Sequence, residues 1–96
     1  MKILVIEDDD AIIDTIRLTF QVGWPAVEVV SAELGEKGLK LVESLSPDAV
    51  ILDLGLPDIN SFEVLKAIRL FSIVPVVVLT VQPDERSVIK ALEMGA

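Results

Sequence analysis

The stretch Asp48–Pro57 constrains the fold more than any other part of the chain. After Asp48 comes an unbroken apolar run, Ala49–Leu52, that is β-branched at its centre. Such a short run is typical of a strand buried on both faces, as in a parallel sheet. The run ends on the carboxylate of Asp53, and Gly55 then favours a turn. Because ligands of open α/β sheets bind outside the carboxyl ends of the strands, Asp53 is a candidate functional residue; the alternative is a surface aspartate that merely ends a strand.

The same alternation of strand and helix is predicted along the whole chain. Further strands are expected at Lys2–Ile6, at Val27–Val30 (where Glu28 suggests an edge strand) and at Pro75–Thr80. Helical spacing follows each run, at Ile12, Ile13, Ile16 and Phe20; at Gly35, Gly38, Leu39, Val42 and Leu45; at Phe62, Leu65 and Ile68; and at Val88, Ile89 and Leu92. Four β/α units joined by right-handed crossovers predict one domain, residues 1–96, with a parallel sheet and helices on both faces.

Local signals mark several ends of these predicted helices. The first helix should begin near Asp9 or Asp10, and Asn60 resembles a helix N-cap. Gly95 fits a position just after a helix. We interpret Gly35 and Gly38 as sites of close packing against the sheet, because no glycine-rich phosphate loop follows a strand.

Composition excludes several classes of protein. The chain has 96 residues, of which 52% are hydrophobic, so disorder is excluded. A net charge of -8 argues against nucleic-acid binding by this segment, since phosphates require lysine and arginine. No apolar run is long enough to span a membrane, and cysteine is absent. Because Met1 and Lys2 lead directly into the first predicted strand, we expect no signal peptide. We therefore expect a soluble cytoplasmic domain that has no membrane partner.

Polar side chains gather where three predicted strands end. Glu7–Asp10 is a run of four acids, of which one or two would suffice to cap a helix. Glu7 and Asp8 follow the first strand, Asp53 ends the third, and Thr80 ends the fourth. Neighbouring strands lie about 4.8 Å apart, so these side chains can converge on one site. Carboxylates without histidine or cysteine favour a hard cation such as Mg²⁺.

Four segments in this order resemble the receiver domain of bacterial two-component response regulators. They are Ile3–Asp9, Asp48–Asp58, Pro75–Thr80 and Ala91–Ala96, and the match extends from end to end of the chain. Each motif alone is weak, but the four together at these spacings are highly specific. The resemblance implies a flavodoxin-like (CheY-like), doubly wound parallel sheet with strand order 2-1-3-4.

The resemblance also implies a function and a role for each site residue. Asp53 would be the nucleophile that accepts a phosphoryl group from a sensor histidine kinase, forming an acyl phosphate. Mg²⁺ would be bound by Asp8, Asp53, the backbone carbonyl of Gly55 and, through water, Glu7. Thr80 would bind the phosphoryl group and shift an inactive–active equilibrium. Such a domain is not an enzyme, apart from the Mg-assisted phosphorylation and dephosphorylation of itself. Its phosphorylation would switch a downstream output, which is commonly transcription.

Two departures from the family pattern stand out. Ser61 occupies a position where the family usually has glycine, which a serine tolerates only without a strained positive φ. We expect this chain to lack the family's fifth strand, the lysine at the end of that strand and the fifth helix. Lys66 and Lys90 lie on predicted helices and do not occupy the place of that lysine. We therefore expect a domain incomplete at its C-terminus, with the fourth strand as an exposed edge. We expect such a chain to form a homodimer through that edge, to exchange elements with a second copy, or to be poorly stable.

Two other functions compete with the phosphoacceptor. One is a phosphorylation-incompetent pseudo-receiver, or a truncated fragment, that acts as an interaction or dimerisation module. The other is a haloacid-dehalogenase-like phosphatase, which also uses a strand-end aspartate as its nucleophile. That family places a second aspartate two residues later, where this chain has Gly55, so this alternative is poor.

Overall fold

Alternating strands and helices make up the part of the protein that the computed structural model describes, residues 1–79 and residue 95. The elements are β1 (Lys2–Ile6), α1 (Asp10–Gly23), β2 (Glu28–Ala32), α2 (Gly35–Leu45), β3 (Ala49–Asp53), α3 (Ser61–Arg69) and β4 (Val76–Leu79). The predicted end of the fourth strand at Thr80, and the fourth helix with Val88, Ile89 and Leu92, lie outside the described residues.

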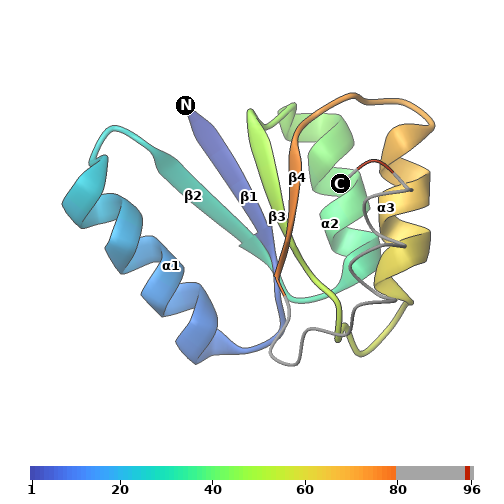
Figure 1. Ribbon diagram of the computed structural model, residues 1–96, viewed down its shortest axis with the longest axis horizontal. Helices are drawn as coiled ribbons and strands as arrows, with labels where there is room; N and C mark the ends of the chain where they lie inside the picture. Colours follow the sequence, from blue (N-terminus) through green and yellow to red (C-terminus); the bar gives the residue numbers. More distant parts are fainter. Residues whose placement is uncertain (80–94, 96) are drawn as a thin grey trace.

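The four strands form one parallel sheet in the order β2-β1-β3-β4 (Figure 1). Ile6 pairs with Leu52 of β3 and with Ala32 of β2, so the carboxyl ends of these three strands lie at the same edge. Asp53 pairs with Leu79 of β4. The α/β class, the parallel sheet and the strand order expected from the sequence are confirmed.

Helices α2 and α3 cover one face of the sheet, on the right in Figure 1. Leu4, Ile6, Val50 and Leu52 are fully buried beneath them. From the helices, Val42 of α2 and three α3 side chains, Val64, Leu65 and Ile68, complete this core. The apolar periodicity of these two helices therefore predicted the correct faces.

Helix α1 covers the other face, mainly over β1 and β2. Ile13 packs on Ile3 and Val5, with Phe20 partly buried beside them. Farther along the sheet this face is more open: Ile51 is only partly buried, and Val77 is 59% exposed. The prediction that the run Ala49–Leu52 is buried on both faces is thus correct in full for one face and only in part for the other. No described helix is long and apolar enough to cross a membrane.

Short-range signals set the helix ends as expected. Asp9 is the N-cap of α1, and its carboxylate accepts from the main-chain N–H groups of Ala11 and Ile12 at 2.9 and 3.4 Å. Asn60 is the N-cap of α3 and accepts from the N–H of Phe62 at 2.8 Å. These bonds satisfy donors that the first helical turn leaves free. The limits of the second strand differ from the prediction. It was expected at Val27–Val30 but is observed at Glu28–Ala32, where its residues pair with β1.

The two glycines of α2 allow close packing, but against different neighbours. A Cβ at Gly38 would lie 2.5 Å from the Ile6 side chain of β1, as the expectation of helix–sheet packing requires. A Cβ at Gly35 would overlap Ile59 and Val64 instead, so this glycine packs against α3 and the loop before it. Gly95, whose predicted helix lies outside the described residues, has a φ of +93°, a conformation that favours glycine.

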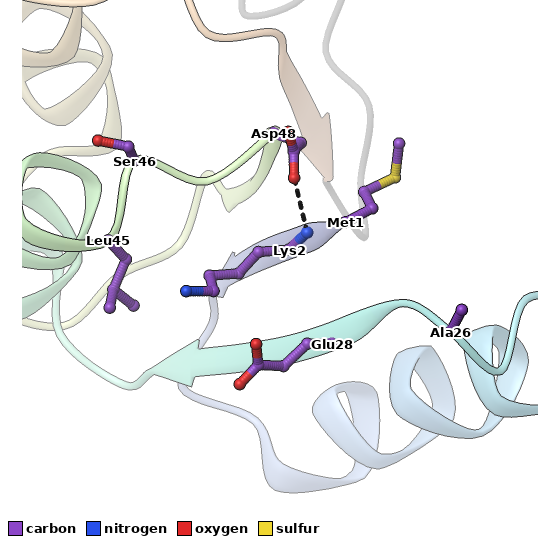
Figure 2. A pocket seen from close by; sticks show the side chains of 7 residues that line it. All are labelled: Met1, Lys2, Ala26, Glu28, Leu45, Ser46 and Asp48. Carbon is purple, nitrogen blue, oxygen red and sulfur yellow. Dashed lines mark hydrogen bonds between the residues drawn. The ribbon is translucent and has the colours of Figure 1, made fainter.

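The amino end of the sheet carries a shallow polar hollow of about 340 Å³ (Figure 2). Lys2, Glu28 and Asp48 are among its lining residues. The main-chain N–H of Lys2 donates to the Asp48 carboxylate at 2.7 Å, which ties β1 to the start of β3. Acidic and basic side chains are therefore mixed in this hollow.

Candidate functional site

Three carboxylates converge at the carboxyl end of the sheet. Glu7 and Asp8 follow β1, and Asp53 is the last residue of the neighbouring strand β3. One carboxylate oxygen from each lies within 4.8 Å of the other two. Glu7 is only 2% exposed and Asp53 only 8%, whereas Asp8 is open to solvent. The fold therefore brings together the three carboxylates that the sequence placed at one site.

Glu7 is held in place by main-chain groups. Its N–H donates to the Ala32 carbonyl at 3.0 Å, and its Oε1 accepts from the N–H groups of Asp8 and Asp9 at 3.1 Å each. Its Oε2 is buried and has no hydrogen-bond partner among the described residues. An unpaired buried oxygen is costly, which makes it a natural position for a cation or a cation-bound water.

Burial raises the pKa of the Glu7 carboxyl to about 7. The negative charge of Asp53 and the closeness of the Asp8 and Asp53 carboxyl groups add to this increase, while the main-chain hydrogen bond from Asp9 opposes it. The site thus holds acidic groups closer together than their charges favour. A divalent cation would relieve the repulsion and restore the charged form of Glu7.

Three further residues, Gly55, Asp9 and Thr80, are close to these carboxylates in the chain or in the sheet. A Cβ at Gly55 would lie 3.7 Å from Oδ2 of Asp53, in ordinary van der Waals contact, so residue 55 lies directly beside this carboxylate. Asp9, next to Asp8 in the chain, caps α1. Thr80 directly follows Leu79, the partner of Asp53, but lies outside the described residues, so its role stays a prediction.

Two contacts around the site were not predicted from the sequence. Ser61 donates its hydroxyl to the main-chain carbonyl of Asp53. Asp58, in the loop before α3, accepts from the N–H groups of Gly35 and Glu36 at 2.9 and 3.2 Å and so caps α2. These bonds, the stronger being that from Gly35, lower the pKa of Asp58. Ser61 and Asp53 are 8 positions apart, and Asp58 is 22 to 23 positions from its partners, so no local sequence pattern predicts these bonds.

Ser61, which stands where the family usually has glycine, does not adopt a positive φ. Ser61 is the first residue of α3, and Ser46 is the only described residue other than glycine with a positive φ. The serine therefore fits without backbone strain.

The donor set fits Mg²⁺, which prefers oxygen ligands and accepts one or two carboxylates together with waters. Asp8 and Asp53 offer direct ligands, and the unpaired oxygen of Glu7 offers a partner for a bound water. The acidic cluster could thus bind a metal ion at the position where the third strand ends.

Comparisons with known proteins agree on one family. The family model described as the response regulator receiver domain matches residues 3–96. The chain is 40% identical to the transcriptional regulatory protein AfsQ1 of Streptomyces coelicolor and 37% identical to the KDP operon transcriptional regulatory protein KdpE of Escherichia coli. Each match covers 99% of this chain and 41% of the relative, so the chain spans about two-fifths of these regulators.

A solved structure gives the same result. The BeF3-activated N-terminal receiver domain of Klebsiella pneumoniae RstA superposes with a TM-score of 0.90 at 29% identity. The match covers 100% of this chain and 80% of that one. Together with its sheet order and its acidic cluster, these matches show that the chain belongs to the receiver domain family of response regulators.

Proposed function

We propose that this domain accepts a phosphoryl group on Asp53 in a Mg²⁺-dependent reaction and so switches a downstream output. The observation that carries the proposal is the convergence of Glu7, Asp8 and Asp53 within 4.8 Å at the carboxyl end of the sheet. Family membership supports it further. The donor would be the phosphohistidine of a sensor kinase, and the domain would act in the cytoplasm.

The reaction follows from the position of Asp53. One of its carboxylate oxygens attacks the phosphorus of the phosphohistidine, the P–N bond breaks, and the imidazole leaves with the electron pair. A bound Mg²⁺ would offset the negative charge that the phosphoryl oxygens bring to this acidic site. Asp8, Asp53 and the Gly55 carbonyl would hold the cation, and Glu7 would hold one of its waters. Gly55 itself places no side chain beside the Asp53 carboxylate.

Thr80 would then donate its hydroxyl to a phosphoryl oxygen and favour the active conformation. Its place in the chain, one residue after the β4 partner of Asp53, supports this role. Since the transcriptional regulators AfsQ1 and KdpE are relatives, we propose transcription as the process that the output controls.

The test is the intact mass of the protein after incubation with acetyl phosphate and Mg²⁺. We expect one added phosphoryl group in the wild-type protein, and none in Asp53→Asn or when EDTA replaces Mg²⁺. No addition to the wild-type protein would contradict the proposal. It would favour the interaction module instead, for which β4 offers an edge of the described sheet with Val77 59% exposed.

A further inference from the structure

The hydroxyl of Ser61 contacts the residue proposed to accept the phosphoryl group. Ser61 is 2% exposed, and its Oγ donates to the main-chain oxygen of Asp53 at 2.5 Å. This distance is at the short end of the range for O–H···O bonds. The bond joins the first residue of α3 to the last residue of β3.

The Asp53–Leu54 peptide is consequently held on both of its sides. Its carbonyl oxygen accepts from Ser61, and its N–H, that of Leu54, donates to the Leu79 carbonyl at 3.2 Å. A peptide is planar, so two bonds on opposite sides restrict its rotation. The side chain of Asp53 is attached before this peptide and Gly55 follows it by one residue, so both proposed metal ligands depend on its orientation.

The loop after this peptide is anchored at its far end as well. Ser61 itself closes the loop of residues 54–60, and Asp58 within it is bound to the N-terminus of α2. Of these contacts, the Ser61 bond is the one that acts directly on Asp53.

We infer that Ser61 is a positioning residue for the cation site, through the hydrogen bond that its hydroxyl donates to the Asp53 carbonyl. The inference rests on the proposed function, because it concerns the Mg²⁺ that the carboxylates would bind. Preorganised ligands bind more tightly because less conformational freedom is lost when the ion arrives. Because the Ser61 hydroxyl donates to the Asp53 carbonyl, it would act on the ion through Asp53 and Gly55 and not as a ligand.

The experiment measures Mg²⁺ affinity in the unphosphorylated protein, by NMR titration of the Gly55 amide shift. Ser61→Ala removes the donor, and we expect it to weaken Mg²⁺ binding roughly threefold to tenfold, in line with the net value of one hydrogen bond. Ser61→Cys keeps the size of the side chain but donates weakly, and it should weaken binding similarly. The ¹³C shift of the Asp53 carbonyl should change in both variants.

The matched control is Ser72→Ala, which removes a serine hydroxyl that accepts from the Val74 N–H at 3.0 Å in the α3–β4 loop, away from the site. Its Mg²⁺ affinity should equal that of the wild-type protein even if its stability falls, since the titration reports on folded molecules. If Ser61→Ala does not fold, Ser61→Cys decides the matter.

Folded Ser61 variants that bind Mg²⁺ as tightly as the wild-type protein overturn the inference while leaving the proposed function intact. A wild-type protein whose Asp53 and Gly55 signals ignore Mg²⁺ overturns the proposed function itself. The two failures are therefore distinguishable.

Discussion

Leu52 and Asp53 are neighbours in the chain, yet they belong to regions with opposite energetics. Leu52 is fully buried among the apolar side chains beneath α2 and α3. Asp53 is nearly as buried, but it lies beside two other carboxylates and near an unpaired oxygen of Glu7. The apolar core stabilises the fold, whereas the acidic cluster costs stability when no cation is present. Functional sites commonly carry such strain, which the rest of the fold must offset.

The largest effect is expected from opening the core. Leu52→Ala should lower the free energy of unfolding by about 2–5 kcal/mol, because it removes buried methyl groups and leaves a cavity. Urea unfolding followed by circular dichroism measures this loss. Ile51→Ala, on the partly open face of the same strand, is the control and should cost clearly less. Equal losses at the two positions would contradict the difference between the faces.

The contribution of the acidic cluster to stability should change with pH in the opposite sense to that of an ordinary ion-paired carboxylate. The pKa of Glu7 is raised from 4.5 to about 7, so the folded state keeps a proton that the unfolded state releases. Without divalent cations, the contribution of Glu7 is therefore fully present below pH 4.5 and is lost as pH rises to about 7. The free energy of unfolding should fall by on the order of 3 kcal/mol over this pH range.

Glu7→Gln should abolish this loss and leave the protein more stable than wild type at neutral pH in EDTA. Chemical unfolding at several pH values tests it, with the exposed Glu63→Gln as a control that should keep the wild-type slope. This account would be refuted if the stability of the wild-type protein, measured relative to Glu7→Gln, stayed level or rose between pH 4.5 and 7. Added Mg²⁺ should stabilise the wild-type protein more than Glu7→Gln.

The smallest effect is expected at the link between the site loop and α2. Asp58→Ala removes the carboxylate that accepts from the Gly35 and Glu36 N–H groups, so stability should fall slightly at neutral pH. Because the pKa of Asp58 is lowered, its contribution is present above 3.8 and is lost as pH falls through the folded-state value. Wild type and variant should therefore become equally stable in acid.

Amide hydrogen exchange provides the direct measurement for this link. The Gly35 N–H should exchange faster in Asp58→Ala, while the exposed Asp14→Ala should leave it unchanged. Unchanged protection of Gly35 in Asp58→Ala would show that the cap does not persist in solution.

The sequence was informative wherever a feature depends on neighbouring residues. Asp9 and Asn60 act as helix caps as expected, because capping requires only the next two or three residues. The convergence of Glu7, Asp8 and Asp53 was also predicted, since parallel strands bring their carboxyl ends to one edge. Contacts set by tertiary position were not: the bond of Ser61 to Asp53, the cap that Asp58 forms on α2, and the limits of β2.

The most direct test of the central claim locates the phosphoryl group. Protein treated with acetyl phosphate and Mg²⁺ is reduced with borohydride, which converts an aspartyl phosphate to homoserine, and is then digested and sequenced by tandem mass spectrometry. We predict homoserine at position 53 alone, and none when EDTA replaces Mg²⁺. Homoserine at another aspartate, or an unmodified Asp53 in a folded, Mg²⁺-bound protein, would contradict the assignment of this acidic cluster as a phosphoacceptor site.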